Sequence, residues 1–200
     1  MKYPDFFDKV PTITLQDPLA NMLGAFEDGI ITFSYTDIVK SAGHSCPTVA
    51  GAYLMSLVGL KALYEDKIPV RGEIKVAFGE SIEEGVIGVI ANVISNITGA
   101  TAKSGFKGLG SKFARNNLMD FGQNLDASVR FLDIKSDKSI DIYYNPSVVP
   151  IDPNMQPLMQ KIMQDRATKE EKIEFKNLWQ NRVKEILIHT DKYDGLVECR

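Results

Sequence analysis

The stretch PTVAGAYLMSLVGLKALY, residues 47–64, decides the fold. It opens with a proline, which suits the first position of a helix, and Ser45 or Cys46 precedes it as the N-cap. Its residues are apolar on nearly every face of a helix, and a helix of that kind is buried on all sides. We therefore predict that this segment is the central, buried helix of the protein.

Strand and helix patterns alternate around this segment. The stretch 86–98 is rich in β-branched residues, but its apolar positions fall on one helical face, so we interpret it as a helix. Further helices are predicted from Pro18 to about Gly24 and over 36–41, and strands over 30–35, 73–78, 129–134 and 140–144. The pattern predicts an α+β fold in which a mixed or antiparallel sheet packs on the buried central helix.

A proline-rich segment, residues 145–157, separates this core from the C-terminal part of the chain. We expect a core domain over 1–150 and a helical extension over 151–200. The extension is predicted to contain a helix over 158–165 and a longer helix that begins with a capping box at Thr168. The apolar stripe of the longer helix must be covered by its own core or by a second copy of the chain, and we favour a homodimer.

Composition excludes several classes of function. The chain has 200 residues and a net charge of −3, which argues against non-specific binding to nucleic acid. Its longest apolar run, residues 48–60, is too short to span a bilayer, and no signal peptide opens the sequence. We expect a cytoplasmic protein with no membrane partner. Its two cysteines are too few for a Cys₄ zinc site.

The candidate site lies immediately before the central helix, where His44 and Cys46 stand two residues apart. Imidazole and thiolate are both good ligands for zinc, iron, nickel or copper. The partial positive charge of a helix N-terminus also favours the thiolate form. A single His-x-Cys pair is a weak motif, however, and on residue types alone a structural role for both side chains is the commoner outcome.

Three segments give the chain a family resemblance. Gly43-His44-Ser45-Cys46-Pro47, Thr98-Gly99-Ala100-Thr101 and Asn117-Leu118-Met119-Asp120-Phe121-Gly122 resemble, in order and approximate spacing, motifs of the E-type subunit family of formylmethanofuran dehydrogenase. The resemblance covers about residues 15–145. It implies an α+β core, often dimeric, with a metal or active site near the histidine-cysteine motif. The genes of this family are associated with a molybdenum or tungsten formylmethanofuran dehydrogenase.

Several positions depart from that family's pattern. Family members often have a second histidine where this chain has Ala42, a cysteine at the position of Ala100, and a glycine at the position of Thr48. The C-terminal cysteines of the family's zinc-binding domain are also absent. We therefore expect a divergent member that lacks the C-terminal zinc-binding domain and is not a true component of a methanogenic enzyme.

Two protein ligands hold a transition metal poorly, so further donors are needed. His189, the only other histidine, could complete the site within the chain or across a dimer, or be a surface residue at a helix end. Tyr53 could direct its hydroxyl toward the site or belong to the core. Cys199 is expected to be a free thiol near the end of the chain. A Cys-Pro thiolate and a histidine are also axial ligands of haem, which we keep as an alternative cofactor.

A glycine- and lysine-rich loop follows the helix over 86–98. Lys103 and Lys107, with Arg115 close behind, could bind an acidic ligand through their charges and the loop's backbone N–H groups, although a solvated loop is the commoner outcome. The resulting hypothesis is a metal-dependent enzyme, with zinc or iron most expected, that acts on a small acidic molecule. The alternatives are a metal or haem sensor or carrier without turnover, and a non-catalytic interaction protein.

Overall fold

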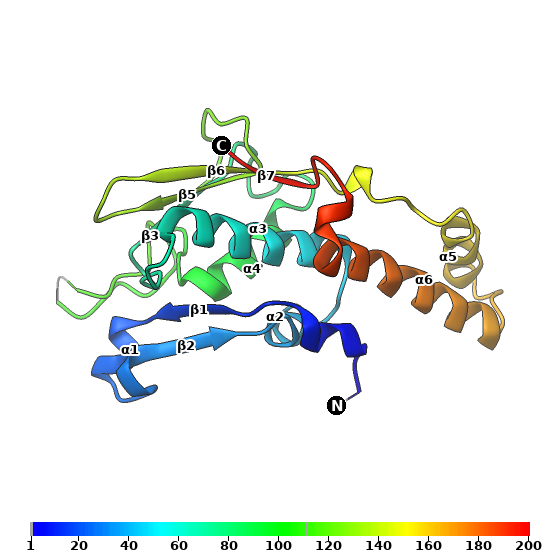
Figure 1. The fold of residues 1–200 in the computed structure, drawn as a ribbon, viewed down its shortest axis with the longest axis horizontal. Coiled ribbons are helices and arrows are strands. Elements are labelled where there is room, and N and C mark those ends of the chain that lie inside the picture. Colours follow the sequence, from blue (N-terminus) through cyan, green and yellow to red (C-terminus); the bar gives the residue numbers. More distant parts are fainter. Residues whose placement is uncertain (1, 111) are drawn as a thin grey trace.

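The structure is a computed structural model that describes residues 2–110 and 112–200, and helix α3 (Pro47–Tyr64) lies at its centre (Figure 1). The helix has the bounds that the sequence predicts. Its N-cap is Cys46, and most of its length is buried because almost every position is apolar. The prediction of a buried central helix is confirmed.

One mixed sheet covers α3. Its strand order is β4-β3-β5-β6-β7, with β3 and β4 parallel and all other neighbours antiparallel. The strands are β3 (Ile74–Ala77), β4 (Met119–Asp120), β5 (Val129–Asp133), β6 (Ser139–Tyr144) and β7 (Val197–Cys199). A separate antiparallel pair is formed by β1 (Ile13–Gln16) and β2 (Ile30–Phe33). The α+β class and the mixed sheet are thus confirmed.

The remaining helices follow the sequence closely. They are α1 (Pro18–Met22), α2 (Tyr35–Ala42), α4 (Ile87–Thr98), α5 (Met155–Met163) and α6 (Lys169–Ile188). Short 3₁₀ turns, η1 to η4, cover Asp5–Lys9, Glu27–Gly29, Pro146–Val148 and Thr190–Lys192. The interpretation of 86–98 as a helix is confirmed by α4. Both bonds of the predicted capping box at the start of α6 are present, between Thr168 and Glu171.

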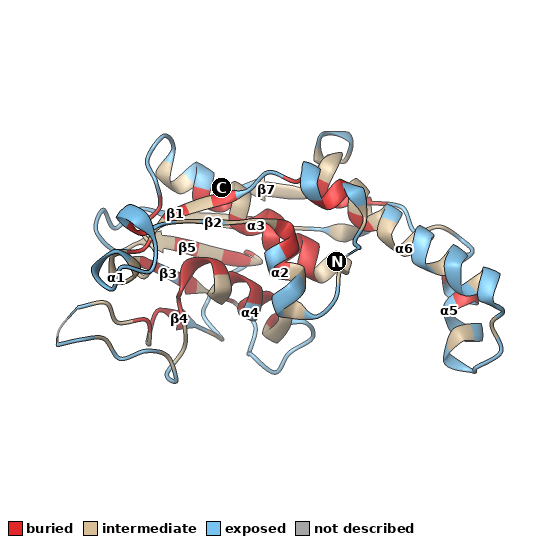
Figure 2. Cartoon of the chain, turned by 90° about the horizontal axis from the view of Figure 1, so that it is seen from below, coloured by how far each residue is buried: buried red, intermediate tan, exposed pale blue. Residues whose placement is uncertain are grey.

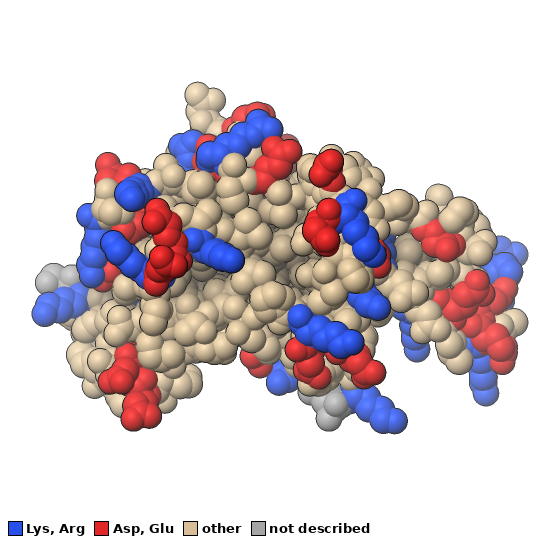
Figure 3. All heavy atoms as spheres, viewed as in Figure 1, with Lys and Arg blue, Asp and Glu red and all other residues tan. Residues whose placement is uncertain are grey.

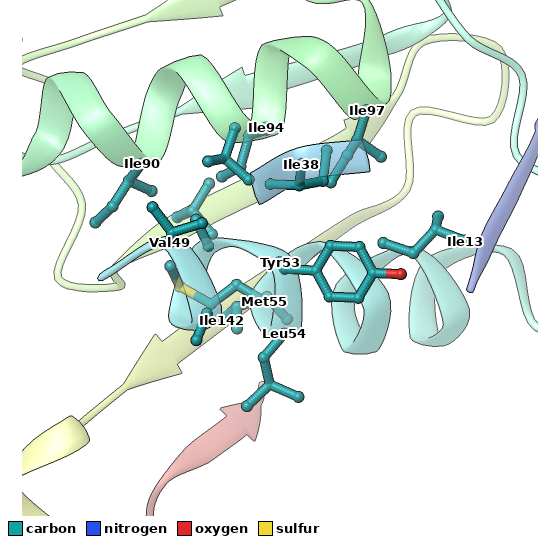
Figure 4. Close-up of a cluster of buried hydrophobic side chains, with 14 of the residues drawn as sticks. Ile13, Ile38, Val49, Tyr53, Leu54, Met55, Ile90, Ile94, Ile97 and Ile142 are labelled. Atoms are coloured by element: carbon teal, nitrogen blue, oxygen red, sulfur yellow. The ribbon is translucent and has the colours of Figure 1, made fainter. Parts of the chain in front are cut away.

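The elements form three layers, with α3 and α4 between the five-stranded sheet and the β1–β2 pair (Figure 1). Aliphatic side chains from all layers meet around Tyr53 (Figure 4). They include Ile13 from β1, Ile38 from α2, Ile90, Ile94 and Ile97 from α4, and Ile142 from β6. This core packs around α3 and so fixes the position of the loop at the start of α3.

The predicted C-terminal helical pair is present. Its outer part is largely exposed, and the end of α6 is buried (Figure 2). Helix α5 and the first half of α6 project beyond the sheet, whereas Val183, Ile186 and Leu187 near the end of α6 are buried in the core. The strand β7, which the sequence analysis did not predict, then joins the core sheet beside β6. The domain boundary at residue 150 stays a prediction. No described helix is long and apolar enough to cross a membrane.

Candidate functional site

The candidate site is the short connection between α2 and α3, and both of its ends are fixed by helix caps. Gly43 ends α2 in the left-handed conformation (φ 76°), and its N–H donates to Val39 O. This backbone conformation strongly favours glycine. Three residues later, Cys46 begins α3 as its N-cap. His44 and Ser45 are therefore held between two helix ends.

His44 is exposed, and one of its ring nitrogens is bonded to the backbone. Its Nδ1 lies 3.0 Å from Ala42 O. A carbonyl oxygen has no proton to donate, so Nδ1 must bear the hydrogen, and in the neutral ring Nε2 keeps a free lone pair. Histidines that bind metals are commonly oriented in this way, by donating the other ring N–H to a backbone carbonyl. The side chain lines a polar hollow of about 360 Å³ with Asn92 and Asn96 of α4.

Cys46 is half-buried, and its sulfur is part of the helix cap. Val49 N–H donates to Cys46 Sγ at 3.4 Å. Two phenols lie near this sulfur, those of Tyr35 and Tyr144. Burial raises the pKa of both phenols and outweighs the opposing effects of the Ser45 hydrogen bond on Tyr35 and of the Arg182 charge on Tyr144. Both tyrosines therefore stay neutral and are able to donate hydrogen bonds.

Ser45, between the two candidate ligands, is held by helix α6. Its carbonyl accepts hydrogen bonds from Trp179 Nε1 at 2.9 Å and from Gln180 Nε2 at 3.2 Å. Its hydroxyl lies 2.9 Å from Tyr35 OH and donates to Gln180 Oε1 at 3.2 Å. The sequence analysis noted an apolar stripe on this helix but missed these polar contacts. Together they fix the peptide that joins His44 to Cys46.

Tyr144 supports the start of α3 from the sheet side. Its hydroxyl donates to Pro47 O at 3.0 Å, and its ring packs directly on Gly51. A cavity of about 380 Å³ opens beside it, lined by Pro47, Thr48 and Tyr144 and bordered by two carboxylates, Glu80 and Glu84. A small molecule could thus approach the first turn of α3, in surroundings that are mainly apolar.

A comparison with protein families matches residues 42–192 to the family described as FmdE, Molybdenum formylmethanofuran dehydrogenase operon. The chain belongs to this family. The resemblance found in the sequence is thereby confirmed, and its extent is corrected, because the FmdE match begins at the candidate loop and runs through both C-terminal helices. A comparison with curated proteins found no match. The family's description concerns the operon of a molybdenum enzyme, which is consistent with a metal-associated role.

Two of the other candidate residues lie elsewhere in this FmdE fold. His189 is the C-cap of α6, with Nε2 3.8 Å from Glu185 Oε1. It comes nine residues after Gln180, which corresponds to about 14 Å along a helix axis. Tyr53 is fully buried in the core, where its hydroxyl donates to Pro11 O at 2.7 Å and to Phe33 O at 3.1 Å. Neither side chain lines the hollow beside His44.

The candidate anion-binding residues also lie apart from His44. Lys103 and Lys107 are exposed, and Arg115 is buried in an ion pair with Asp17. None of these three cationic side chains lines the hollow that contains His44. The ligand-binding role of the two lysines stays a prediction. The ligand-binding role of Arg115 likewise stays a prediction, and its guanidinium is paired with Asp17.

The donor atoms at the loop suit a transition metal in kind but not in number. An imidazole Nε2 and a thiol are typical ligands of zinc and iron. Within the described residues, no group of three or more His, Cys, Asp or Glu side chains gathers to hold an ion. A closed four-ligand site is therefore not formed by the described part of the chain alone. Cys46 does not line the hollow that contains His44, and its sulfur caps α3, so a metal held by both side chains would need further donors from other molecules.

Proposed function

We propose that the protein binds zinc or iron through His44 Nε2 and Cys46 Sγ, and that it is a metal-dependent enzyme acting on a small molecule. The observation that supports this most directly is the bond from His44 Nδ1 to Ala42 O. It leaves Nε2 as the free donor, in the arrangement found at many metal-binding histidines. The family's association with a metalloenzyme operon supports the same proposal.

An open site with two protein donors leaves room for a substrate. A bound metal would act there as a Lewis acid that polarises a carbonyl of the substrate. The chain's own residues have separate tasks. Trp179 and Gln180 fix Ser45 and so keep the two donors in place. The phenols of Tyr35 and Tyr144 hold the loop and the first turn of α3, through Ser45 Oγ and Pro47 O respectively. An acidic substrate and a cytoplasmic location stay predictions.

The chain contains a built-in reporter for this site. Trp179 is its only tryptophan, and its indole N–H contacts Ser45 O between the two proposed ligands. We therefore expect Zn²⁺ or Co²⁺ to change the tryptophan fluorescence of metal-free protein with a stoichiometry of one. With Co²⁺, a thiolate-to-metal charge-transfer band should also appear. Both signals should be lost in His44→Ala and in Cys46→Ser.

The second cysteine and the second histidine provide matched variants. Cys199→Ser changes an exposed thiol in β7 and should bind metal as the wild type does. His189→Ala tests the expected third ligand, because a loss of affinity would assign His189 to the site. Folded wild-type protein that binds neither ion, or that binds both equally well without His44 and Cys46, would contradict the proposal.

The same measurements separate the alternatives. A Soret band in the purified protein would indicate haem in place of a single metal ion. Metal bound at His44 and Cys46 without turnover of any carbonyl substrate would indicate a sensor or carrier. Absence of metal, combined with full stability of both variants, would leave a non-catalytic interaction protein.

We further propose that the projecting α5–α6 arm joins two copies in a homodimer. Apolar side chains remain exposed on this arm, including Met163 at 78% and Ile173 at 58%. Met163 lies in α5 and Ile173 in α6. Large apolar side chains left exposed on a projecting arm are candidates for an interface between two copies. Sedimentation should give a dimer for the wild type and a monomer for Ile173→Glu. A wild-type monomer at micromolar concentration would contradict this proposal.

A further inference from the structure

A buried cluster of charges lies at the C-terminal end of α4, where Arg71 donates to Asn96 O and Ile97 O. Asp17 caps α1 by accepting hydrogen bonds from Leu19 N and Ala20 N. The same carboxylate accepts hydrogen bonds from Arg71 Nη1 at 2.8 Å and from Arg115 Nη2 at 2.7 Å. One negative charge therefore faces two guanidinium groups, and the cluster has an excess of positive charge.

The two arginines differ in how many of their donors are used. Arg71 also donates through Nε to Ile97 O and through Nη2 to Asn96 O. The side chain of Arg115 is only 8% exposed, and within the described residues Asp17 is the sole hydrogen-bond partner of its guanidinium. A guanidinium has five N–H donors. Within the described residues, the Nε and Nη1 of Arg115 form no hydrogen bond, so a ligand in the pocket that Arg115 lines has donors to bind.

Two glycines make room for these arginines. A Cβ at Gly72 would lie 1.3 Å from Arg115 Nη1, and a Cβ at Gly99 would lie 3.2 Å from Arg71 Cγ and 3.3 Å from Arg115 Cδ. Both glycines have positive φ angles, which other residues rarely adopt. The position of Arg115 is therefore determined by the backbone around it and is not the chance placement of a surface side chain.

Arg71 and Arg115 line an open pocket of about 430 Å³. Lys112 and Lys135 add two further positive charges at its wall, and Glu73, which pairs with Lys135 at 2.8 Å, adds one negative charge. Counting Asp17 as well, four cations face two carboxylates. This local excess of two positive charges contrasts with the net charge of −3 of the whole chain. Figure 3 shows that charges of both signs are interspersed on the face in view.

The rest of the pocket wall is mainly apolar. It is formed by Phe113, Leu118 and Ile134, with Pro18 at the start of α1. A pocket with an apolar wall and a few convergent polar groups is typical of small-molecule sites. Its volume also lies within the range of such sites, about 300–1,000 Å³. The occupant should therefore combine an anionic group with an apolar body.

We propose that this pocket binds a small organic carboxylate. The carboxylate would accept a hydrogen bond from a free N–H of the Arg115 guanidinium, with Lys112 adding charge, and the apolar body would pack on Phe113 and Leu118. A hydrogen bond between a guanidinium and a carboxylate is assisted by both charges and is therefore stronger than a bond between neutral groups. The sequence analysis expected Arg115 to bind an acidic ligand, and this pocket shares no lining residue with the hollow that contains His44.

The pocket is separate from the hollow that contains His44, and Asn96 links the two through its hydrogen bond with Arg71. The backbone carbonyl of Asn96 in α4 accepts a hydrogen bond from Arg71 Nη2. The side-chain amide of Asn96 donates to Ser41 Oγ at 2.6 Å. Both Asn96 and Ser41 line the hollow that contains His44. The carboxylate pocket does not require a metal, so His44→Ala should leave its affinity unchanged.

Benzoate is a suitable probe, because it joins a carboxylate to an apolar ring. Calorimetric titration of the full chain should show one site, and benzyl alcohol, which lacks the charge, should not bind. Lys112→Glu changes the charge at the pocket by two units and should weaken benzoate binding roughly five- to tenfold. Lys103→Glu makes the same change in the same loop, at an exposed residue outside the pocket, and should have less than a twofold effect.

Arg115→Lys keeps the charge but removes the planar fork, so it should lose most of the affinity. If that variant fails to fold, the comparison of Lys112→Glu with Lys103→Glu still decides the proposal. Equal benzoate affinity in these two variants would overturn it. So would stronger binding of inorganic phosphate than of benzoate, or the absence of benzoate binding at concentrations up to about 10 mM.

Discussion

Replacing Gly51 with alanine tests how closely the sheet packs on the central helix. Gly51 lies in the second turn of α3, and the Tyr144 ring from β6 lies directly over it. A Cβ at this position would be 2.2 Å from Tyr144 Cε1 and 2.4 Å from Cζ. Non-bonded carbon atoms prefer about 3.5–4.0 Å, so the ring would have to move by more than about 1 Å.

The size of the effect follows from three contributions. Overpacking a well-filled core costs about 1–3 kcal/mol, and the stiff, mostly buried ring places this case near the upper end. Moving the ring also weakens the bond from Tyr144 OH to Pro47 O, which contributes about 1 kcal/mol. Against this, alanine is favoured over glycine in a helix by about 1 kcal/mol. We expect Gly51→Ala to lower the free energy of unfolding by about 2–3 kcal/mol.

Urea denaturation followed by circular dichroism measures this change, and Gly88→Ala is the matched control. Gly88 lies in α4, where the nearest atom to an added Cβ would be Ile82 O at 3.5 Å, an ordinary contact. That variant should be unchanged or up to about 1 kcal/mol more stable. A Gly51→Ala protein as stable as the Gly88→Ala protein would refute the close packing of Tyr144 on α3.

Two further substitutions test the buried contacts. Asp17→Asn leaves the charges of Arg71 and Arg115 without a carboxylate and should cost about 3–5 kcal/mol in urea denaturation. Burial alone would raise the pKa of Asp17, but the bonds and charges of both arginines outweigh it and hold the pKa below its ordinary 3.8. The stability that this carboxylate contributes is therefore constant above about pH 4 and is lost at lower pH, so the difference between wild type and Asp17→Asn should shrink only there. Trp179→Phe removes the N–H donor to Ser45 O and should cost about 1 kcal/mol in the same assay, and an unchanged free energy of unfolding would contradict the contact.

Helices were predictable from the sequence because their signals are local. The bounds of α3 are those expected from a proline at the start and an unbroken apolar pattern. The capping box of α6 needs only Thr168 and Glu171, which are three residues apart. The segment of α4 was harder, since its β-branched residues favour a strand, and there the apolar face of the helix was the better guide.

Three short strands, β1, β4 and β7, were not predicted, since their formation depends on distant partners. Strand β7 has three residues and no alternating apolar pattern of its own. It forms because Val197–Cys199 pairs with β6, more than fifty positions earlier in the chain. The four residues of β1 and the two of β4 were missed for the same reason. Pairing of this kind is set by the tertiary fold and leaves little trace in a single sequence.

The candidate site shows the same division. The positions of His44 and Cys46 next to a helix start could be read from the sequence, because caps involve neighbouring residues. The partners of Ser45 could not, since Gln180 lies 135 residues away. Likewise, a cationic residue after a glycine-rich loop was noticed, but its carboxylate partner, Asp17, is 98 residues from Arg115. Sequence patterns thus identify reactive side chains better than they identify what surrounds them.

The C-terminal segment contributes to the candidate site and to the core, in addition to forming a projecting helical arm. Helix α6 supplies the two donors that fix Ser45, and its last turns complete the buried core. The chain then returns to the core sheet as β7. The family match through residue 192 includes the Ser45 contacts. Since the loop of His44 and Cys46 is held by α6, any change that displaces this helix should disturb the proposed metal site together with the core.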